Sequence, residues 1–185
     1  MFIEIEKKFE LTDAEHEIIK SKLELDSKEN IEDIYLDLPD FYLIFNKMKF
    51  RIRNGKKELK IKIWNLSSEE YYEKEAIKKI EALKIQYENI KTSVCTIETY
   101  REKYKWKFNW KDYIIDIDKH SWWKRYEIEV ESESEELGSK LIDEITDSLW
   151  LKAIESQTID TKLMSNVKIQ NPKLYEVIIE NNIYW

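Results

Sequence analysis

The chain contains very few of the residues that form phosphate-binding loops, disulfides or flexible linkers. Only 2 glycines and 2 prolines occur among its 185 residues. Their scarcity excludes a glycine-rich loop that binds phosphate through backbone amides, and it excludes long flexible linkers. The single cysteine, Cys95, excludes an internal disulfide and a zinc site built from several cysteines, and it is expected to be a small buried hydrophobic residue. Any phosphate group that the chain binds must therefore be held by side chains.

Long apolar runs and extended stretches of one charge are also missing. The chain has no run of about 18 apolar residues and no charged leader before an apolar segment, so we expect a cytoplasmic protein without a membrane partner. The net charge is −7, and basic residues alternate with acidic ones, which argues against nonspecific binding to duplex nucleic acid. A length of 185 residues predicts a single domain over residues 1–185. We expect this domain to be a monomer or a homodimer.

Charged and apolar residues alternate in many short segments of the chain. Glu4, Glu6 and Lys8 alternate with isoleucines near the start, and successive side chains of a β-strand point to opposite faces. The same alternation recurs in residues 50–53, 58–63, 96–103, 114–118 and 126–131, and residues 33–38 and 42–45 are further strand candidates. Asn54-Gly55 predicts a tight hairpin turn, because both residues tolerate a positive φ angle. The chain therefore predicts a sheet built from several short strands.

The charges on these strands are sorted by sign. Acidic pairs lie on one face of some strands (Glu4 with Glu6, Asp116 with Asp118, Glu127 with Glu129), and basic pairs lie on one face of others (Arg51 with Arg53, Lys60 with Lys62, Arg101 with Lys103). A sheet with one solvated face also alternates, but a solvated face usually mixes small polar residues with lysine. We therefore expect charged faces that point at one another and line a closed or nearly closed antiparallel β-barrel.

Segments with helical spacing lie between the strands. Thr12 and Glu15 form a capping box before an apolar stripe, and Asn171-Pro172 is typical of the start of a helix. Residues 75–87 and 134–150 carry apolar residues on one helical face. The fold class is therefore α+β, with amphipathic helices packed outside the barrel. The C-terminal helical segment, about residues 151–185, is expected to pack on the barrel or to cap it.

The pattern formed by Glu4, Glu6 and Lys8 resembles the opening Glu-x-Glu-x-Lys strand of the CYTH superfamily, the triphosphate tunnel metalloenzymes. Further matches run through nearly the whole chain: Arg51 and Arg53 resemble the family's Arg-x-Arg, Lys60 the lysine of its next strand, Glu73 and Glu75 its central acidic pair, Arg101 and Lys103 its later basic strand, Asp116 and Asp118 the following acidic strand, and Glu127 and Glu129 its closing Glu-x-Glu. Two positions depart from the family. Tyr72 stands where an arginine is often found, and Leu38 replaces the threonine of a Tyr-x-Asp-Thr-Pro stretch.

The resemblance implies an eight-stranded barrel that forms a charged tunnel, a divalent metal cofactor and a small triphosphate ligand. Mg²⁺ or Mn²⁺ is the implied cofactor, since hard divalent ions take oxygen ligands. The implied metal ligands are Glu4, Glu6, Glu75, Asp116, Asp118, Glu127 and Glu129. The implied catalytic and phosphate-binding residues are Lys8, Arg51, Arg53, Lys60, Lys62, Glu73, Arg101 and Lys103, because basic side chains bind phosphate through charge-assisted hydrogen bonds.

The function that the resemblance implies is metal-dependent hydrolysis of the terminal phosphoanhydride of inorganic tripolyphosphate, thiamine triphosphate or a nucleoside triphosphate. The tail from Lys162 to Tyr175 looks most like the thiamine triphosphatase branch, and tripolyphosphatases and RNA 5′-triphosphatases share the tunnel. Three alternatives stay open: a class IV-type adenylyl cyclase, a noncatalytic polyphosphate-binding module, and a charged sheet used for protein interaction. His120 could shuttle protons, but a histidine in a surface loop is the simpler expectation.

Overall fold

The computed structural model describes residues 3–7, 9–64, 67–108, 111–120, 123–132, 134–152, 154–155 and 162–183. It describes the backbone alone for residues 3–7, 9–10, 63–64, 67–68, 108, 111, 123–132, 135 and 154–155. The elements in chain order are β1 (Ile3–Lys7), β2 (Phe9–Glu10), α1 (Asp13–Lys22), β3 (Glu24–Asp37), α2 (Tyr42–Phe45), β4 (Met48–Arg53), β5 (Lys56–Trp64), β6 (Ser67–Tyr72), α3 (Glu73–Ala82), the short 3-10 helix η1 (Tyr87–Asn89), β7 (Thr92–Phe108), β8 (Lys111–His120), β9 (Trp123–Ser132), α4 (Glu135–Ser148), β10 (Ile154–Glu155), α5 (Lys162–Gln170) and α6 (Pro172–Glu180).

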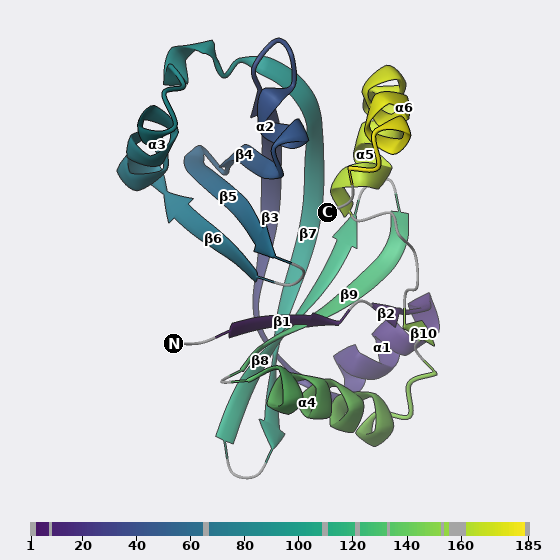
Figure 1. The fold of residues 1–185 in the computed structure, drawn as a ribbon. Helices are drawn as coiled ribbons and strands as arrows, with labels where there is room; N and C mark the ends of the chain where they lie inside the picture. The colour runs from purple at the N-terminus through teal and green to yellow at the C-terminus, as the bar shows by residue number, and fades with distance from the viewer. Residues whose placement is uncertain are drawn as a thin grey trace. The chain divides into compact units, whose positions relative to one another are not determined.

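Eight strands form one sheet in the order β1-β9-β8-β7-β3-β4-β5-β6, and β2 pairs with β10 separately (Figure 1). Every pairing whose register is described is antiparallel, so the α+β class and the antiparallel sheet are confirmed. Of the predicted closed or nearly closed eight-stranded barrel, the closure is not confirmed: in the part of the chain that the structure describes, β1 and β6 are the two edges of the sheet. Alternating charge marks the polar face of each strand, but it carries no information on whether the first and last strands pair.

The chain divides into two compact units, each made of two chain segments. Unit 1 comprises residues 1–30 and 98–157, and unit 2 comprises residues 31–97 and 158–185. The long strands β3 and β7, of 14 and 17 residues, contribute to both units. Each unit has its own hydrophobic core, and each is described separately below.

The core of unit 1 forms where α1 and α4 cover the apolar faces of β7 and β8 (Figure 1). Ile142 of α4 and Ile117 of β8 are both nearly fully buried there, and burying an isoleucine side chain stabilises a fold by about 1.5–3 kcal/mol. Both helices begin as predicted. Thr12 and Glu15 form the capping box of α1, and the Ser134 side chain accepts a hydrogen bond at the start of α4.

In unit 2, β4 and β5 form the predicted hairpin. Asn54 and Gly55 occupy the turn with φ angles of 46° and 81°, the positive values that a tight two-residue turn requires. Phe50 and Leu59 lie opposite each other on the apolar face of this hairpin and pack with Ile80 of α3. The period-2 alternation therefore sends the apolar residues toward α3 and leaves the opposite face of the hairpin to charged residues.

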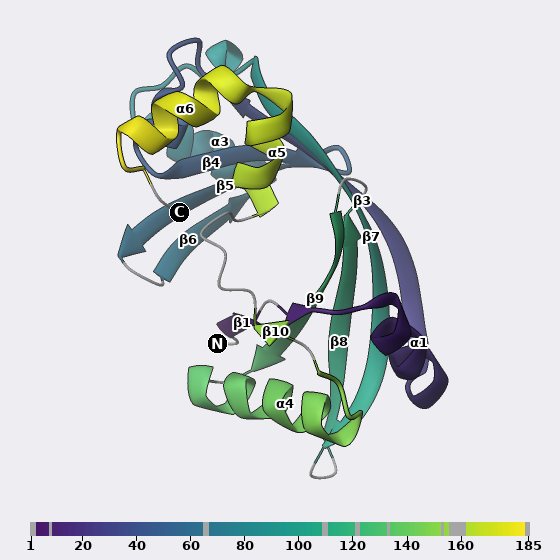
Figure 2. The same cartoon turned by 90° about the vertical axis from the view of Figure 1, so that its right-hand side faces the viewer.

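A second cluster in unit 2 joins α5 and α6 to β3 and β7 (Figure 2). Leu163 of α5 and Ile178 of α6 pack there with Val94 and Cys95 of β7, and α6 begins with Asn171 as its N-cap, as predicted. Cys95 is 2% exposed, and burial raises the pKa of its thiol to about 12. The expectation of a small buried hydrophobic residue is confirmed.

Residues 42–45 form the helix α2, so the strand predicted there is wrong. The carboxylate of Asp37 explains the difference, because it accepts hydrogen bonds from the backbone N–H groups of Leu38, Leu43 and Ile44 at 2.7, 2.8 and 2.9 Å. These bonds close the segment after β3 into a turn and satisfy the first amides of α2. A local pattern of apolar residues does not reveal a cap that lies several residues earlier.

The strand interpretation of Glu73 and Glu75 is also wrong. Glu73 has a φ angle of 49°, and the chain turns there into α3, so both carboxylates lie exposed in the first helical turn. Negative charge is favourable at that position because of the helix dipole. His120 lies at the end of β8 and is 4% exposed, which corrects the expectation of a surface loop.

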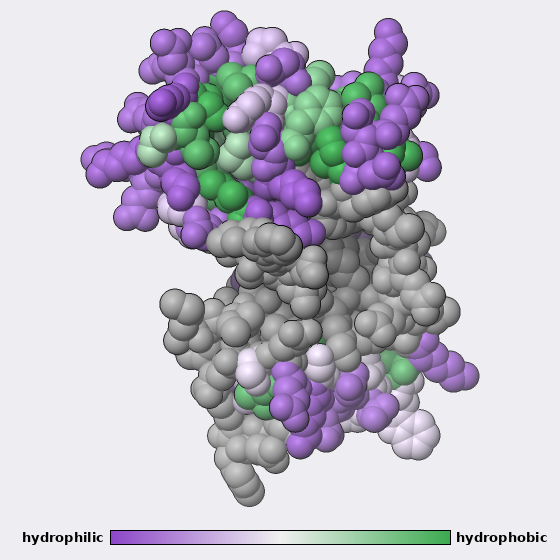
Figure 3. All heavy atoms as spheres, in the orientation of Figure 1, coloured by the Kyte–Doolittle hydropathy of each residue, from purple (hydrophilic) through white to green (hydrophobic). Residues whose placement is uncertain are grey.

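No helix of the described residues is long and apolar enough to cross a membrane. On the face shown in Figure 3, hydrophilic residues of unit 2 surround smaller hydrophobic areas. This distribution agrees with a chain of which 37% is charged, since charged side chains are mostly exposed.

Candidate phosphate and metal sites

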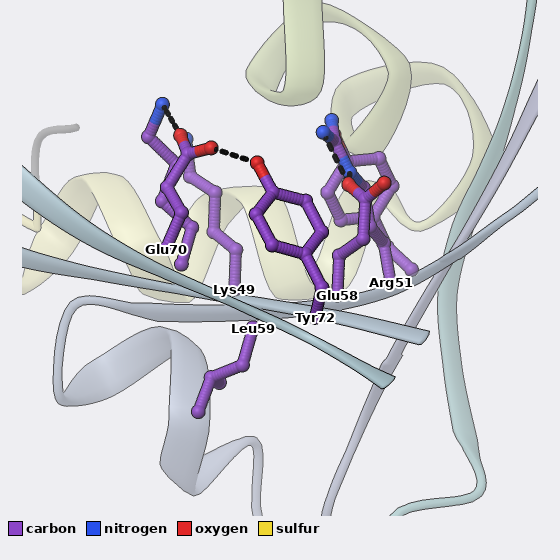
Figure 4. A pocket seen from close by; sticks show the side chains of 8 residues that line it. Lys49, Arg51, Glu58, Leu59, Glu70 and Tyr72 are labelled. Atoms are coloured by element: carbon purple, nitrogen blue, oxygen red, sulfur yellow. Dashed lines mark hydrogen bonds and ion pairs between the residues drawn. The ribbon is translucent and has the colours of Figure 1, made fainter. Parts of the chain in front are cut away.

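One face of β4, β5 and β6 in unit 2 is lined by charged and tyrosine side chains. The register aligns them in two rows across the strands: Tyr35-Arg51-Glu58-Tyr72 and Lys49-Lys60-Glu70. Together with Leu59 they line an open hollow, which we call the Arg51 pocket. Figure 4 shows the polar side chains on one side of the strands and Leu59 on the other.

Arg51 is held on several sides beside this pocket. Its Nε and Nη2 atoms both lie 2.6 Å from Oε2 of Glu58, and its Nη1 donates to the Tyr35 hydroxyl over 3.3 Å (Figure 4). Nη1 also lies 3.7 Å from Oδ2 of Asp33. Burial alone would lower the pKa of Arg51, but the surrounding acidic groups raise it above its ordinary value. The guanidinium is therefore a fixed donor that stays charged.

Lys60, Glu70 and Tyr72 form a linked group on the same face. Nζ of Lys60 lies 2.6 Å from Oε1 of Glu70, and the Tyr72 hydroxyl donates to Oε2 of Glu70 over 2.6 Å (Figure 4). That hydrogen bond, together with burial, raises the pKa of Tyr72 to about 12. Burial would raise the pKa of Glu70, but the bonds from Lys60 and Tyr72 hold it below its ordinary value. An anion that binds Lys60 therefore meets a charged Glu70 at the same ammonium group.

Arg53 is paired with a carboxylate that is fully buried. Its Nε donates to Oδ1 of Asp33 over 2.7 Å and its Nη2 to Oδ2 over 2.9 Å, and Asp33 is 0% exposed. Burial would raise the pKa of Asp33, but the Arg53 hydrogen bonds and the nearby positive charges, including Lys162 of α5, lower it. Helix α5 thus brings another cation toward the two arginines of unit 2.

In unit 1 the register places three predicted metal ligands in one row. Glu6 of β1 lies opposite Glu129 of β9, and Glu129 lies opposite Asp116 of β8. We call these three residues the acidic row. Directly opposed residues of an antiparallel pair share one face of the sheet, with Cβ atoms about 4.5–5.5 Å apart. Lys103 of β7 occupies the next position of the same row.

Two basic residues of β7 contact the aspartates of β8. Arg101 donates through Nε and Nη2 to Oδ1 and Oδ2 of Asp118 over 2.6 and 2.7 Å, and through Nη1 to Oδ2 of Asp116 over 2.6 Å. Nζ of Lys103 lies 3.3 Å from the same Oδ2 atom. Both oxygens of Asp118 thus accept hydrogen bonds from Arg101, which favours a role for Asp118 as its partner over a role as a metal ligand.

Asp116 has an oxygen that suits a cation. Its Oδ1 atom is buried and accepts no hydrogen bond from the described residues. Burial raises the pKa of this carboxyl, and Arg101 and Lys103 offset only part of the effect. A divalent ion would supply the missing partner, and the all-oxygen donors of the acidic row fit Mg²⁺ or Mn²⁺.

The predicted metal centre is only partly within the described side chains. Among those side chains, no group of three or more His, Cys, Asp or Glu residues is placed to hold a metal ion. The side chains of four predicted ligands, Glu4, Glu6, Glu127 and Glu129, lie outside the described set. The metal site therefore rests on strand register and on Oδ1 of Asp116.

The face of β7 opposite Arg101 and Lys103 carries a buried carboxylate with a structural role. Glu102 is 4% exposed, and its oxygens lie 2.7 Å from His16 Nε2, Tyr104 Oη and Lys28 Nζ. Burial would raise the pKa of Glu102, but these partners lower it to about 2. Glu102 lies between Arg101 and Lys103 in sequence, so it anchors the strand that presents both bases.

The structure brings together some of the predicted site residues and separates others. Arg51, Arg53 and Lys60 share one face, whereas Lys62 lies further along β5, opposite Ser68 and outside the Arg51 pocket. The helix α3 removes the predicted acidic pair Glu73 and Glu75 from the strand. Lys8 lies outside the described residues.

Sequence reasoning missed the acidic partners of the bases and the cation from the tail, namely Asp33, Glu58, Glu70 and Lys162. Spacing offered one usable signal: Glu58 precedes Lys60 by two residues, so both had to share a face. The same rule places Glu70 on one face with Tyr72, the residue opposite Glu58.

The fold and these charged faces agree with a known family. A family model described as the CYTH domain matches residues 3–163. The chain belongs to the CYTH family. No curated protein matches this CYTH chain.

Three solved structures similar to this CYTH chain illustrate the fold. HpAC1 from Hippeastrum, an adenylyl cyclase candidate described as having a dominant triphosphatase activity, has a TM-score of 0.67 and 16% identity, covering 86% of this chain and 93% of that one. An adenylate cyclase candidate from Bacillus halodurans has a TM-score of 0.58 and 18% identity, covering 88% and 96%. The PH1819 protein from Pyrococcus horikoshii has a TM-score of 0.58 and 21% identity, covering 84% and 95%. At these identities the likeness concerns the fold.

Proposed function

We propose that this CYTH protein is a metal-dependent triphosphatase that hydrolyses the terminal phosphoanhydride of a small triphosphate. The observation that carries the proposal is the Arg51 pocket, where Arg51, Lys49 and Lys60 gather on one face of a hairpin. Such a set matches the charge of a triphosphate and can bind several of its oxygens. The triphosphatase activity described for the Hippeastrum relative supports the same choice.

The arginines of unit 2 would bind and stabilise the phosphates. The Arg51 guanidinium is protonated at every physiological pH, as arginine is in proteins generally, and Arg53 is held by Asp33 in a fixed orientation. Phosphoryl transfer passes through a loose transition state with charge spread over the phosphate oxygens. Donors that are already oriented toward that charge lower the barrier without further rearrangement.

The acidic row of unit 1 would hold the metal, with Glu4 and Glu127 as further predicted ligands. Asp116 offers a buried oxygen that has no hydrogen-bond partner among the described residues, and Glu6 and Glu129 share its row. When bound, Mg²⁺ or Mn²⁺ would supply positive charge to phosphate oxygens and lower the pKa of a bound water. In this proposal Arg101 and Lys103 neutralise the aspartates of β8 and contact phosphate.

Free-phosphate release tests this proposal. The purified full chain is incubated with inorganic tripolyphosphate, thiamine triphosphate and ATP in parallel, with Mg²⁺, with Mn²⁺ and with EDTA. We expect release that depends on the metal, and the preferred compound identifies the substrate branch. Inorganic tripolyphosphate or thiamine triphosphate is the expected choice, because the tail resembles the thiamine triphosphatase branch.

Product analysis of the ATP reaction separates the alternatives. Conversion of ATP to cyclic AMP without release of free orthophosphate would replace the triphosphatase proposal by an adenylyl cyclase. Tight binding of tripolyphosphate without any turnover in either metal would replace it by a noncatalytic polyphosphate-binding module.

A further inference from the structure

We propose that Asp33 is a positioning residue that orients the guanidinium of Arg53 for binding phosphate. The inference rests on the proposed function, which gives Arg53 a phosphate to bind. Asp33 lies directly opposite Arg53 in the register of β3 and β4, and it is 0% exposed. It touches no solvent, so it acts only through the groups packed around it.

The contact between the two side chains uses one edge of the guanidinium. Nε of Arg53 donates to Oδ1 of Asp33 over 2.7 Å and Nη2 to Oδ2 over 2.9 Å. A two-point contact of this kind fixes the plane of the guanidinium as well as its position. Nη1 has no contact recorded with the described residues, and the Arg53 side chain is 29% exposed. The contact thus leaves Nη1 as the donor available for a ligand.

A fully buried carboxylate is an unfavourable choice for stability alone. A buried ion pair is often no better than apolar residues of the same volume, because both charges lose their hydration. The Asp33 carboxylate stays charged in this place because Arg53 and Arg51 surround it, with Lys162 contributing to the positive field. A role in orientation explains why a charge is placed here.

The same arrangement occurs independently in unit 1. Arg101 donates through Nε to Oδ1 and through Nη2 to Oδ2 of Asp118, over 2.6 and 2.7 Å, and the two residues are directly opposed in the register of β7 and β8. The Asp118 side chain is 1% exposed. Arg51 differs, because its Nε and Nη2 both contact a single oxygen of Glu58. One buried aspartate thus orients one arginine in each unit.

Binding of inorganic tripolyphosphate measured by calorimetry in EDTA tests the proposal, because it is independent of hydrolysis. The variants are Asp33→Asn, Arg53→Gln, the double variant, and Asp37→Asn as a matched control. Asp37 is a buried aspartate of the same strand whose recorded partners are backbone N–H groups. Folding of each variant is checked by circular dichroism and thermal melting.

We expect Asp33→Asn to weaken binding by about tenfold and to have a much smaller further effect in the Arg53→Gln background, where the 3.7 Å contact of Asp33 with Arg51 is what remains. Asp37→Asn should lower the melting temperature without weakening binding. Wild-type affinity in the folded Asp33→Asn variant overturns the proposal. It is also overturned if Asp33→Asn lowers the affinity equally in the wild-type and Arg53→Gln backgrounds, or if the wild type does not bind tripolyphosphate.

A further variant covers the case in which Asp33→Asn does not fold. Arg53→Lys keeps the charge but cannot make the two-point contact, so it should bind as weakly as Arg53→Gln, and wild-type binding by Arg53→Lys overturns the proposal. Hydrolysis is measured in parallel with Mg²⁺. If binding depends on Asp33 but no hydrolysis occurs, the proposed triphosphatase is refuted and the positioning role of Asp33 stands. If hydrolysis occurs but binding is insensitive to Asp33, the positioning role is refuted and the proposed triphosphatase stands.

Discussion

The two units of this CYTH protein carry opposite charge excesses on their strand faces. In unit 2, Lys49, Arg51 and Lys60 outnumber the two glutamates that line the same pocket. In unit 1, the acidic row contains three carboxylates, and Lys103 occupies the next position of the row. Each face is supported by a separate hydrophobic core. In the proposed triphosphatase, this difference would divide the work, with unit 2 supplying donors for phosphate and unit 1 supplying oxygen ligands for a metal.

The largest expected effect comes from removing a charge from the acidic row. Glu6→Gln keeps the size of the side chain but removes a predicted metal ligand, so we expect kcat/KM to fall by about 100-fold or more. Steady-state assays over a range of Mn²⁺ concentrations measure the loss, and excess metal should restore part of it. The exposed Glu144→Gln on α4 is the control. Full activity of Glu6→Gln at low metal would end the assignment of metal binding to unit 1.

The next effect concerns the phosphate donors of unit 2. Arg51→Gln should lower kcat/KM for the triphosphate by about 30- to 100-fold, because a charged donor held against Glu58 is lost. Arg51→Lys should recover only a small part of the activity, since lysine cannot reproduce the planar set of donors. The metal dependence should stay unchanged in both variants. A changed metal requirement would contradict the division between the units. Lys91→Gln, at an exposed position of unit 2, serves as the control.

A third prediction concerns stability and the face of β7 that carries Glu102, opposite the face of Arg101 and Lys103. Glu102→Gln should lower the melting temperature at pH 7 by about 5 °C or more, because it breaks a buried charged network. The pKa of Glu102 is lowered from 4.5 to about 2 in the folded protein. Its stabilisation is therefore complete above pH 4.5 and is lost as the pH falls toward 2, so the difference between wild type and variant should shrink over that window.

The exposed pair of Glu17 and Lys20 provides a matched control for this third prediction. An exposed ion pair contributes about 1 kcal/mol or less, so Glu17→Gln should change the melting temperature little at any pH. A Glu102→Gln variant with the same melting temperature as the wild type at pH 7 would show that the network around Glu102 does not anchor β7.

The smallest expected effect comes from Tyr72→Phe. Tyr72 is 53% exposed and its hydroxyl donates to Glu70, so the variant should lose less than about 1 kcal/mol of stability. Lys60 keeps its contact with Glu70 in this variant, and KM should change by no more than about twofold. Steady-state kinetics and thermal melting measure both quantities. A loss as large as that of Arg51→Gln would assign Tyr72 a direct part in binding the substrate.

Local patterns predicted most of the strands and helices but not the closure of the sheet. The hairpin at Asn54-Gly55 and the capping box at Thr12 depend on neighbouring residues alone, so they could be read directly. The turn at Glu73 could not, because an acidic pair spaced by two fits the end of a strand and the first turn of a helix equally well. Pairing of edge strands depends on contacts that are distant in sequence, and capping by Asp37 depends on a side chain six and seven residues before the amides that it caps.

For the candidate site, too, local patterns predicted the face of each residue but not its partners. Alternation placed Arg51, Arg53 and Lys60 on one face, as the structure has them. It did not show that Asp33 and Glu58 would bind the arginines, because cross-strand partners are set by register and not by the sequence of a single strand. Lys162 was missed as a site residue because only the packing of the C-terminal helices brings it near Asp33.

Each arginine whose side chain the structure describes already contacts a carboxylate, and Lys60 contacts Glu70. An incoming anion therefore meets donors that are already partly occupied: at Arg53 the Asp33 contact leaves Nη1 for it, and at Arg51 and Lys60 it competes with Glu58 and Glu70. A single phosphate can reach few of these donors, whereas a triphosphate carries several charges on one covalent chain, so each contact after the first forms at a high effective concentration. In the proposed triphosphatase, multivalency would then be the basis on which the protein distinguishes triphosphates from orthophosphate.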